Sequence, residues 1–244
     1  MNIVKLKGMV NSNVVTRFLA ERALNVYTLI RRAVTGSYTK YKEDRTVKEY
    51  LLSEYGIAPS KVRYADIGAN DYRRGNNTFL FYKAGARGIL VEANPLLCKK
   101  LKFHRKKDIV KNVAIGTSSM EAIDFYILSL PTRSSMDKAS VEESLSRGLK
   151  VTGVEKIQCV NINELFDHYN LRPDYLSIDI EGMDYAVLKT LDYDKYAIKV
   201  IVAEGSDEKD ENGQTMNEFM HSKGYTKYKE YKSNTIFVRA KKQK

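Results

Sequence analysis

The sequence predicts an α/β protein whose doubly wound, mostly parallel sheet carries helices on both faces. Three apolar runs, residues 62–67, 87–92 and 108–116, alternate with two stretches of helical pattern, residues 76–85 and 94–103. Strand, helix, strand, helix, strand at this spacing is typical of such a sheet. The continuous apolar run at residues 87–92 favours a strand that is covered on both sides. A chain of 244 residues suffices for one such domain and a small extension.

Residues 1–60 are predicted to form a helical extension in front of a sheet domain that spans residues 61–244. Residues 13–33 place apolar side chains at helical spacing, with four arginines giving the helix a basic side (Arg17, Arg22, Arg31 and Arg32). Peripheral contact with a membrane surface through this side is one reading, and packing on the main domain is the commoner arrangement. A second helix over residues 46–55 should end at Gly56, with Pro59 just beyond.

The two helices of the predicted sheet region carry end signals. Gly85 should close the first, while Asn94 can cap the second and Pro95 suits its first position. Residues 121–128 alternate like an added strand. Residues 129–156 are polar, serine-rich and weakly patterned, and a connection this long is usually functional or disordered. A substrate loop and a plain flexible surface loop both remain open for this segment.

The second half of the chain continues the alternation of strands and helices. Asn161 and Glu164 stand at capping-box spacing, as do Thr215 and Glu218. The predicted elements are a strand and helix in residues 157–166, a strand in 174–182, a helix in 183–191, a strand in 199–205, a helix ended by Gly224, and an antiparallel hairpin in 225–240.

Composition limits the function classes. The chain has 41 Lys and Arg against 30 Asp and Glu, a net charge of +11, but the basic residues are spread and no nucleic-acid fold motif accompanies them. Cys98 and Cys159 are too far apart in sequence for a zinc motif or a disulfide framework. No apolar run approaches the roughly 20 residues of a membrane-spanning helix, and the first ten residues do not resemble a secretory signal. We therefore expect a cytoplasmic protein.

A candidate ligand site follows the first two predicted strands. Asp66, Gly68 and Asn70 come at the end of the first, where glycine permits a sharp turn and close approach of a ligand to the backbone. Glu92 ends the second strand, and an acid there commonly accepts both ribose hydroxyls of a nucleotide. Asp66 is placed to hold a cationic amino-acid group, directly or through water. Because a complete G-x-G-x-x-G and a phosphate-binding lysine motif are absent, a nucleoside without pyrophosphate is favoured.

Four motifs in this order resemble the FkbM family of S-adenosylmethionine-dependent methyltransferases: "DIGAN" at 66–70, "GILVEANP" at 88–95, "NVAIG" at 112–116 and "LSIDIEG" at 176–182. The resemblance covers about residues 64–239. It implies a class I methyltransferase fold, with a seven-stranded sheet whose last strand is antiparallel. It also implies methyl transfer from S-adenosyl-L-methionine, usually to a hydroxyl of a sugar, glycolipid or other small metabolite.

The resemblance also implies roles for individual residues. Asp66, Gly68 and Asn70 would line the methionine side of the cofactor, Glu92 would hold the ribose, and Asn94 would lie close to the adenine. Residues 112–114, including Asn112 and Ala114, would lie against the adenine. The chain departs from the family pattern at Ser177, where many relatives carry lysine, and at "DYRRG" (71–75), where they have an earlier glycine.

Acids at later strand ends are the candidate catalytic residues. The resemblance implies that Asp179 and Glu181 face the reacting methyl group. Asp179 is the first choice of general base, with Glu181 or Glu204 either orienting the acceptor or taking the base role, and Glu204 is a further candidate for contact with the acceptor. The sequence offers no dedicated metal-ligand set. Two other readings stay open: a nucleic-acid (RNA) methyltransferase, suggested by the charge, and a non-catalytic nucleotide-binding domain. The sequence indicates neither the acceptor nor the oligomeric state.

Overall fold

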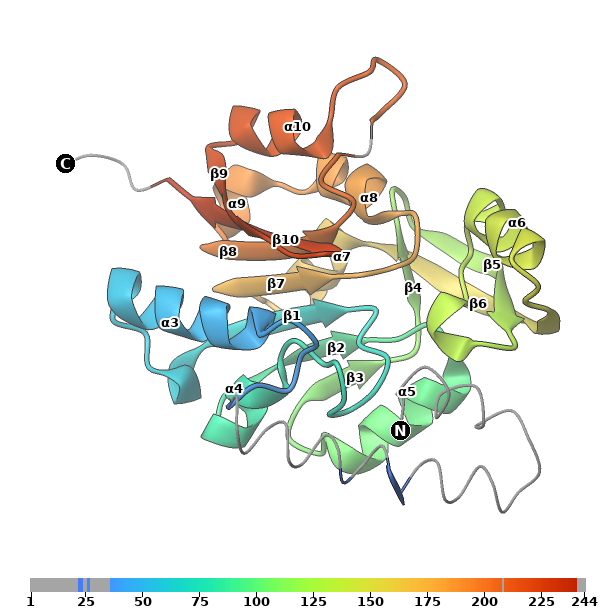
Figure 1. Ribbon diagram of the computed structural model, residues 1–244, viewed down its shortest axis with the longest axis horizontal. Coiled ribbons are helices and arrows are strands. Elements are labelled where there is room, and N and C mark those ends of the chain that lie inside the picture. Colours follow the sequence, from blue (N-terminus) through green and yellow to red (C-terminus); the bar gives the residue numbers. More distant parts are fainter. Residues whose placement is uncertain (1–21, 24–25, 27–35, 208, 241–244) are drawn as a thin grey trace.

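A seven-stranded sheet in the order β3-β2-β1-β7-β8-β10-β9 runs through the computed structural model, which describes residues 22–23, 26, 36–207 and 209–240 (Figure 1). Its strands are β1 (Arg63–Ile67), β2 (Arg87–Val91), β3 (Ile109–Lys111), β7 (Tyr175–Ile178), β8 (Val200–Glu204), β9 (Tyr225–Glu230) and β10 (Asn234–Arg239). The pairs from β3 to β8 are parallel, and β10 runs antiparallel to both of its neighbours. This confirms the predicted fold class and the terminal hairpin.

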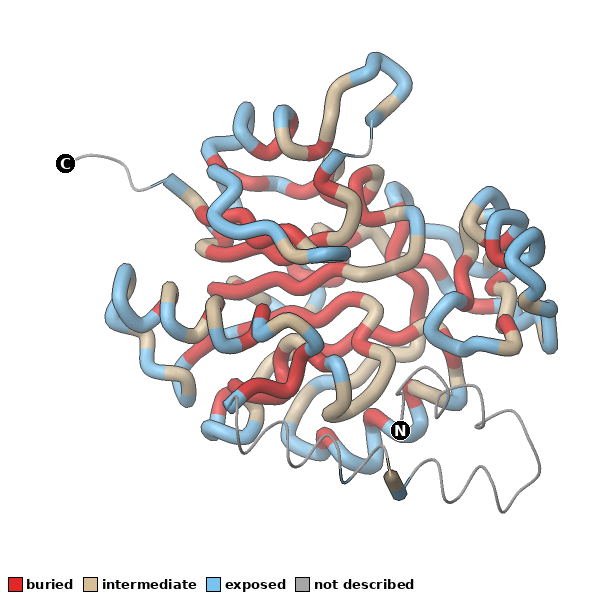
Figure 2. The backbone as a smooth tube through the Cα atoms, in the orientation of Figure 1, coloured by how far each residue is buried: buried red, intermediate tan, exposed pale blue. Residues whose placement is uncertain are grey.

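Helices cover both faces of the sheet. One face packs on α3 (Glu43–Tyr55), α4 (Phe79–Ala84) and α5 (Pro95–His104). The other packs on α7 (Ile162–His168), α8 (Asp184–Thr190), α9 (Tyr193–Tyr196) and α10 (Met216–Ser222). Successive side chains of a strand point to opposite faces. Ala65 and Ile67 therefore pack in the core beneath α7 to α10, while Tyr64 packs in the core beneath α3 to α5. Figure 2 shows the resulting buried layer along the central strands.

Local signals end the helices as predicted at several places. Gly56 follows α3 in the left-handed region, with a φ of 65°, and its N–H reaches the carbonyls of the last turn. The Asn94 side chain accepts hydrogen bonds from the first turn of α5, and Thr215 and Glu218 form a reciprocal capping box. Asn161 caps α7, but Glu164 accepts a hydrogen bond from Ser119 instead of completing a box.

The single strand expected over residues 108–116 is wrong, because the chain breaks at Asn112. The Asn112 side chain donates to the backbone carbonyls of Glu92 and Ala93, each at 2.8 Å. After this break β4 (Ala114–Gly116) leaves the main sheet and joins a second sheet in the order β4-β6-β5, with β5 (Met120–Leu128) and β6 (Val151–Asn161). Apolar residues on both sides of Lys111 and Asn112 made the stretch resemble one strand and concealed the change of partner.

Residues 129–156, expected to lack regular structure, are largely ordered. They contain a 3₁₀ turn, η3 (Pro131–Arg133), the helix α6 (Lys138–Ser146) and the first half of β6; a second 3₁₀ turn, η2 (Pro59–Lys61), precedes β1. The exposed side chains of α6 and of the first half of β6 obscured the pattern, because these residues do not pack in the main core.

Of the predicted N-terminal extension, the second helix is confirmed as α3. The basic helix of residues 13–33 lies almost entirely outside the described residues. Within the part of the chain that the structure describes, none of the helices has the length and apolar character needed to cross a membrane.

Candidate active site

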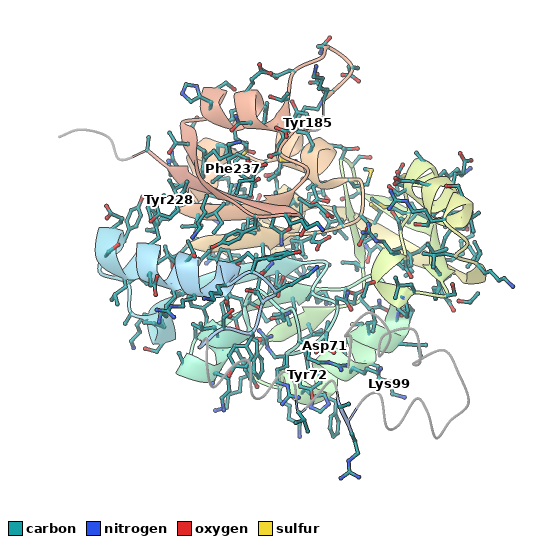
Figure 3. The ribbon with its side chains drawn as sticks, viewed as in Figure 1. Asp71, Tyr72, Lys99, Tyr185, Tyr228 and Phe237 are labelled. Carbon is teal, nitrogen blue, oxygen red and sulfur yellow. The ribbon has the colours of Figure 1, made fainter. Side chains whose placement is uncertain are left out.

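A cavity of about 280 Å³ opens at the carboxyl ends of β1, β2 and β7. The strand order reverses between β1 and β7, which is where open α/β sheets bind ligands. Its walls come from the turn after β1, the ends of β2 and β7, β4, β5 and the segment after β5. Figure 3 shows Asp71 and Tyr72 of that turn lying close together, well away from Tyr185 and Phe237.

Glu92 lies in the cavity wall with both carboxylate oxygens engaged. One oxygen accepts the backbone N–H of Asn70 and the other that of Asn94, each at 2.8 Å. Burial is the main influence on this carboxyl and raises its pKa to about 7, while the two N–H donors act in the opposite direction. Each oxygen keeps a second lone pair, so the carboxylate can accept two further donors from a ligand.

Gly68 is required at the end of β1 for a reason that sequence reasoning missed. Its φ is 80°, and a Cβ added there would overlap the backbone carbonyl oxygen of Asp179. The residue therefore lets β1 and β7 approach each other, in addition to shaping the turn. Asn70 follows with a φ of 52°, and this left-handed conformation presents its N–H to Glu92.

Asp66 is buried in the cavity wall, and one of its two carboxylate oxygens accepts hydrogen bonds from protein side chains. It accepts hydrogen bonds from Asn76 at 3.0 Å and Thr78 at 2.7 Å. The buried Arg105 holds the same two side chains, with N–O distances of 3.0 and 3.1 Å. Burial raises the pKa of Asp66, and these donors and the Arg105 charge oppose the rise. In this arrangement Asp66 organises the turn after β1, and its role toward a cationic group stays a prediction.

The end of the cavity near β4 is apolar. Its side chains are Leu97, Val113, Ala114, Ile115 and Phe125. Ala114 therefore lines the cavity, while its contact with an adenine stays a prediction. Asn94 and Asn112 do not line the cavity, because the first caps α5 and the second holds the end of β2.

Four acids gather at the ends of β7 and β8. Oxygens of Asp179, Glu181 and Glu204 lie within 4.8 Å of one another, an arrangement that can hold a metal ion. The fourth acid, the buried Asp184, accepts the backbone N–H of Ile180 at 3.1 Å. Burial, followed by the neighbouring acids, holds the pKa of Asp179 well above its usual range, and burial is also the main cause of the raised pKa values of Glu181, Asp184 and Glu204. Asp179 and Glu181 line the cavity, whereas Glu204 adjoins them without lining it.

The segment after β5 covers this acidic end. Arg133 forms a 2.6 Å ion pair with Glu181, and Ser135 donates a hydrogen bond to the Glu181 carbonyl at 3.0 Å. Glu181 itself has a φ of 53°, a strained conformation for a residue with a side chain. Backbone strain of this kind is concentrated at functional sites.

Sequence reasoning did not identify Asp184, Arg133 or Arg74 as site residues. Asp184 looks like an ordinary acid of a first helical turn, and Arg133 lies in the segment taken for a loop. Arg74 lines the cavity from the "DYRRG" turn, which had been noted only as a departure from the family pattern. An acid two residues beyond "IDIEG" was the available signal for Asp184.

The sheet order, with its antiparallel β10, and the acid-lined cavity at the switch point define a protein of the class I methyltransferase fold. The family model of the methyltransferase FkbM domain matches residues 66–227, well over half of the chain. The chain belongs to this methyltransferase family.

Comparison with solved structures finds similarity to the crystal structure of the methyltransferase FkbM from Methylobacillus flagellatus KT, with 10% sequence identity and a TM-score of 0.47. The match covers 97% of this chain and 57% of the other, so this chain spans little more than half the length of that protein. Curated protein sequences yield no match.

Proposed function

We propose that the chain is an S-adenosyl-L-methionine-dependent O-methyltransferase that acts on a hydroxyl of a sugar, glycan or small metabolite. One observation carries the proposal: a single cavity joins Glu92, an acceptor suited to ribose hydroxyls, to the acids Asp179 and Glu181. Nucleoside recognition and proton removal would thus lie within one site.

The residues present suit this cofactor. Glu92 offers acceptors at the end of β2, and the apolar side chains around Ala114 form a wall suited to a purine. The acids at the other end favour a cationic group, because their carboxylates lie close together and one arginine, Arg133, pairs with them.

When bound, S-adenosylmethionine supplies an electrophilic methyl carbon on a positively charged sulfur. The chain must then align an acceptor hydroxyl and remove its proton. Asp179 is the proposed general base, because it lines the cavity and because burial raises its pKa, which makes its ionised carboxylate a stronger base. Glu181 and Glu204 would orient the acceptor, and Arg133 offsets part of their charge.

Calorimetry with S-adenosylmethionine and S-adenosylhomocysteine on the wild type and on Glu92→Ala tests the cofactor assignment. We expect binding by the wild type and at least about tenfold weaker binding by the variant, since charge-assisted hydrogen bonds of roughly 1.5–3 kcal/mol each are lost. Absence of binding by the wild type would refute the proposal.

An acceptor screen with labelled methyl groups follows, and Asp179→Asn then tests the base. We expect turnover to fall by about 10²–10⁴-fold with cofactor affinity retained. Glu121→Gln, an exposed acid of β5, is the matched control. Full turnover by Asp179→Asn would remove Asp179 from the mechanism.

A further inference from the structure

The side chains that line the cavity include five acids and a single cation among the described residues. The acids are Asp66, Asp71, Glu92, Asp179 and Glu181; the cation is Arg74. In this cavity the acids can therefore pair with the positive groups of a ligand, and Arg74 is the one charged donor, of the lining residues that the structure describes, that can pair with its carboxylate.

Arg74 has unused hydrogen-bonding capacity. Its Nη1 is buried and finds no acceptor among the described residues. Its Nη2 reaches Asp71 at 3.5 Å, the outer limit for a hydrogen bond. A buried donor without a partner is costly, so the Nη1 group of this side chain, which is 32% exposed overall, favours an acceptor supplied by a ligand.

The turn that carries Arg74 is held in place by other contacts. The Asp71 carboxylate accepts the backbone N–H groups of Arg73 and Arg74, at 2.8 and 2.7 Å. The Tyr72 ring stacks on His104 of α5 with 3.8 Å between ring centroids, and Arg105 donates to the Tyr72 carbonyl at 3.2 Å. Arg74 can therefore turn its guanidinium toward a ligand without the backbone having to form a new structure.

We propose that Arg74 recognises the carboxylate of the methyl donor's amino-acid group. This inference rests on the proposed function. S-adenosylmethionine carries a carboxylate, an ammonium and a sulfonium, which match one cation and several acids in the wall. Asn77 also lines the cavity, and its side-chain amide donates to Ser177 at 3.0 Å, which leaves its carbonyl oxygen as an acceptor for the ammonium.

A second source of the same chemistry is an acidic acceptor that brings its own carboxylate or phosphate. The methyl donor is favoured over the acceptor as the source of the carboxylate. Arg74 stands on the turn after β1, and Asn70 of the same turn donates its N–H to Glu92, whereas the candidate catalytic acids stand at the end of β7. A nucleoside held by Glu92 would bring its amino-acid group toward this turn.

The test compares two ligands on the full chain by calorimetry: S-adenosylhomocysteine, which has the amino-acid group, and 5′-methylthioadenosine, which lacks it. In Arg74→Gln we expect affinity for the first to fall about 10- to 100-fold and affinity for the second to change less than about threefold. Arg73→Gln, which makes the same charge change at a residue outside the cavity wall, should leave both affinities unchanged.

Each other outcome overturns the inference in a recognisable way. Unchanged affinity of Arg74→Gln for both ligands refutes it, and if transfer to acidic acceptors alone then weakens, Arg74 belongs to the acceptor site. Equal losses for both ligands, with an unaltered circular dichroism spectrum, reduce Arg74 to a general support of the cavity. If the wild type binds neither ligand, the proposed function fails and the inference fails with it.

Discussion

Replacement of Glu92 by glutamine should remove two pH dependences of opposite sign. The wild-type carboxyl has a pKa of about 7 in the folded protein, against 4.5 for an ordinary glutamic acid. The folded state therefore holds this proton more tightly than the unfolded state, and the resulting stabilisation is complete below about pH 4.5. It is lost as the pH rises through about 7, with a total loss on the order of 3 kcal/mol.

Donor affinity should change in the other direction over the same range. The ionised carboxylate is purely an acceptor and can take two ribose hydroxyls, whereas the protonated form must donate one hydrogen itself. With a pKa of about 7, roughly a tenth of Glu92 is ionised at pH 6 and nine tenths at pH 8. Binding of S-adenosylhomocysteine should thus be about tenfold weaker at pH 6 than at pH 8.

Glu92→Gln resembles the protonated wild type at every pH. In the wild type Glu92 accepts hydrogen bonds from the backbone N–H groups of Asn70 and Asn94. In the variant one of these N–H groups would face the NH₂ group of the glutamine instead of an acceptor oxygen. We expect weak donor affinity without the tenfold pH change, and a stability that lacks the wild-type loss above pH 4.5.

Calorimetry at pH 6, 7 and 8 and urea unfolding at pH 5 and 8 measure the two effects, with Glu121→Gln as the control at an exposed acid. The difference between the wild type and Glu92→Gln separates the titration of Glu92 from that of the acids near Asp179, whose pKa values are also raised. If the variant kept the wild-type pH slopes, the assignment of the titration to Glu92 would be wrong.

Two further predictions concern the framework of the site. Gly68→Ala should destabilise the protein by roughly 2–5 kcal/mol in urea unfolding, because the new Cβ overlaps the Asp179 carbonyl and the residue is strained in the left-handed conformation. The control Gly56→Ala has a similar φ but open space around it, and it should cost only about 1 kcal/mol. Equal costs for the two variants would contradict the overlap. Arg105→Met should lower the free energy of unfolding by on the order of 3–5 kcal/mol, because it leaves the buried Asp108 carboxylate without its 2.8 Å ion pair. A loss of stability below about 1 kcal/mol in the same assay would contradict this account.

Much of the fold was predictable because its signals are local. The alternation of apolar strands with capped helices depends on residues close in sequence, and Gly56, Asn94 and Thr215 end or begin helices where the pattern placed those boundaries. The break at Asn112 was not predictable, because its partners are the backbone carbonyls of Glu92 and Ala93, just after β2 and about twenty residues away. The helix within residues 129–156 was missed because it buries few side chains.

The sequence by itself determined the order of the elements and which acids come at strand ends, since both depend on spacing along the chain. Only the tertiary structure decided what each acid contacts. It engages Asp66 with the turn that Arg105 braces, leaves Glu92 two free acceptor positions, and surrounds Asp179 with other acids. The physical reason is that burial and hydrogen-bond partners set the charge state and availability of a carboxylate, and both come from residues distant in sequence.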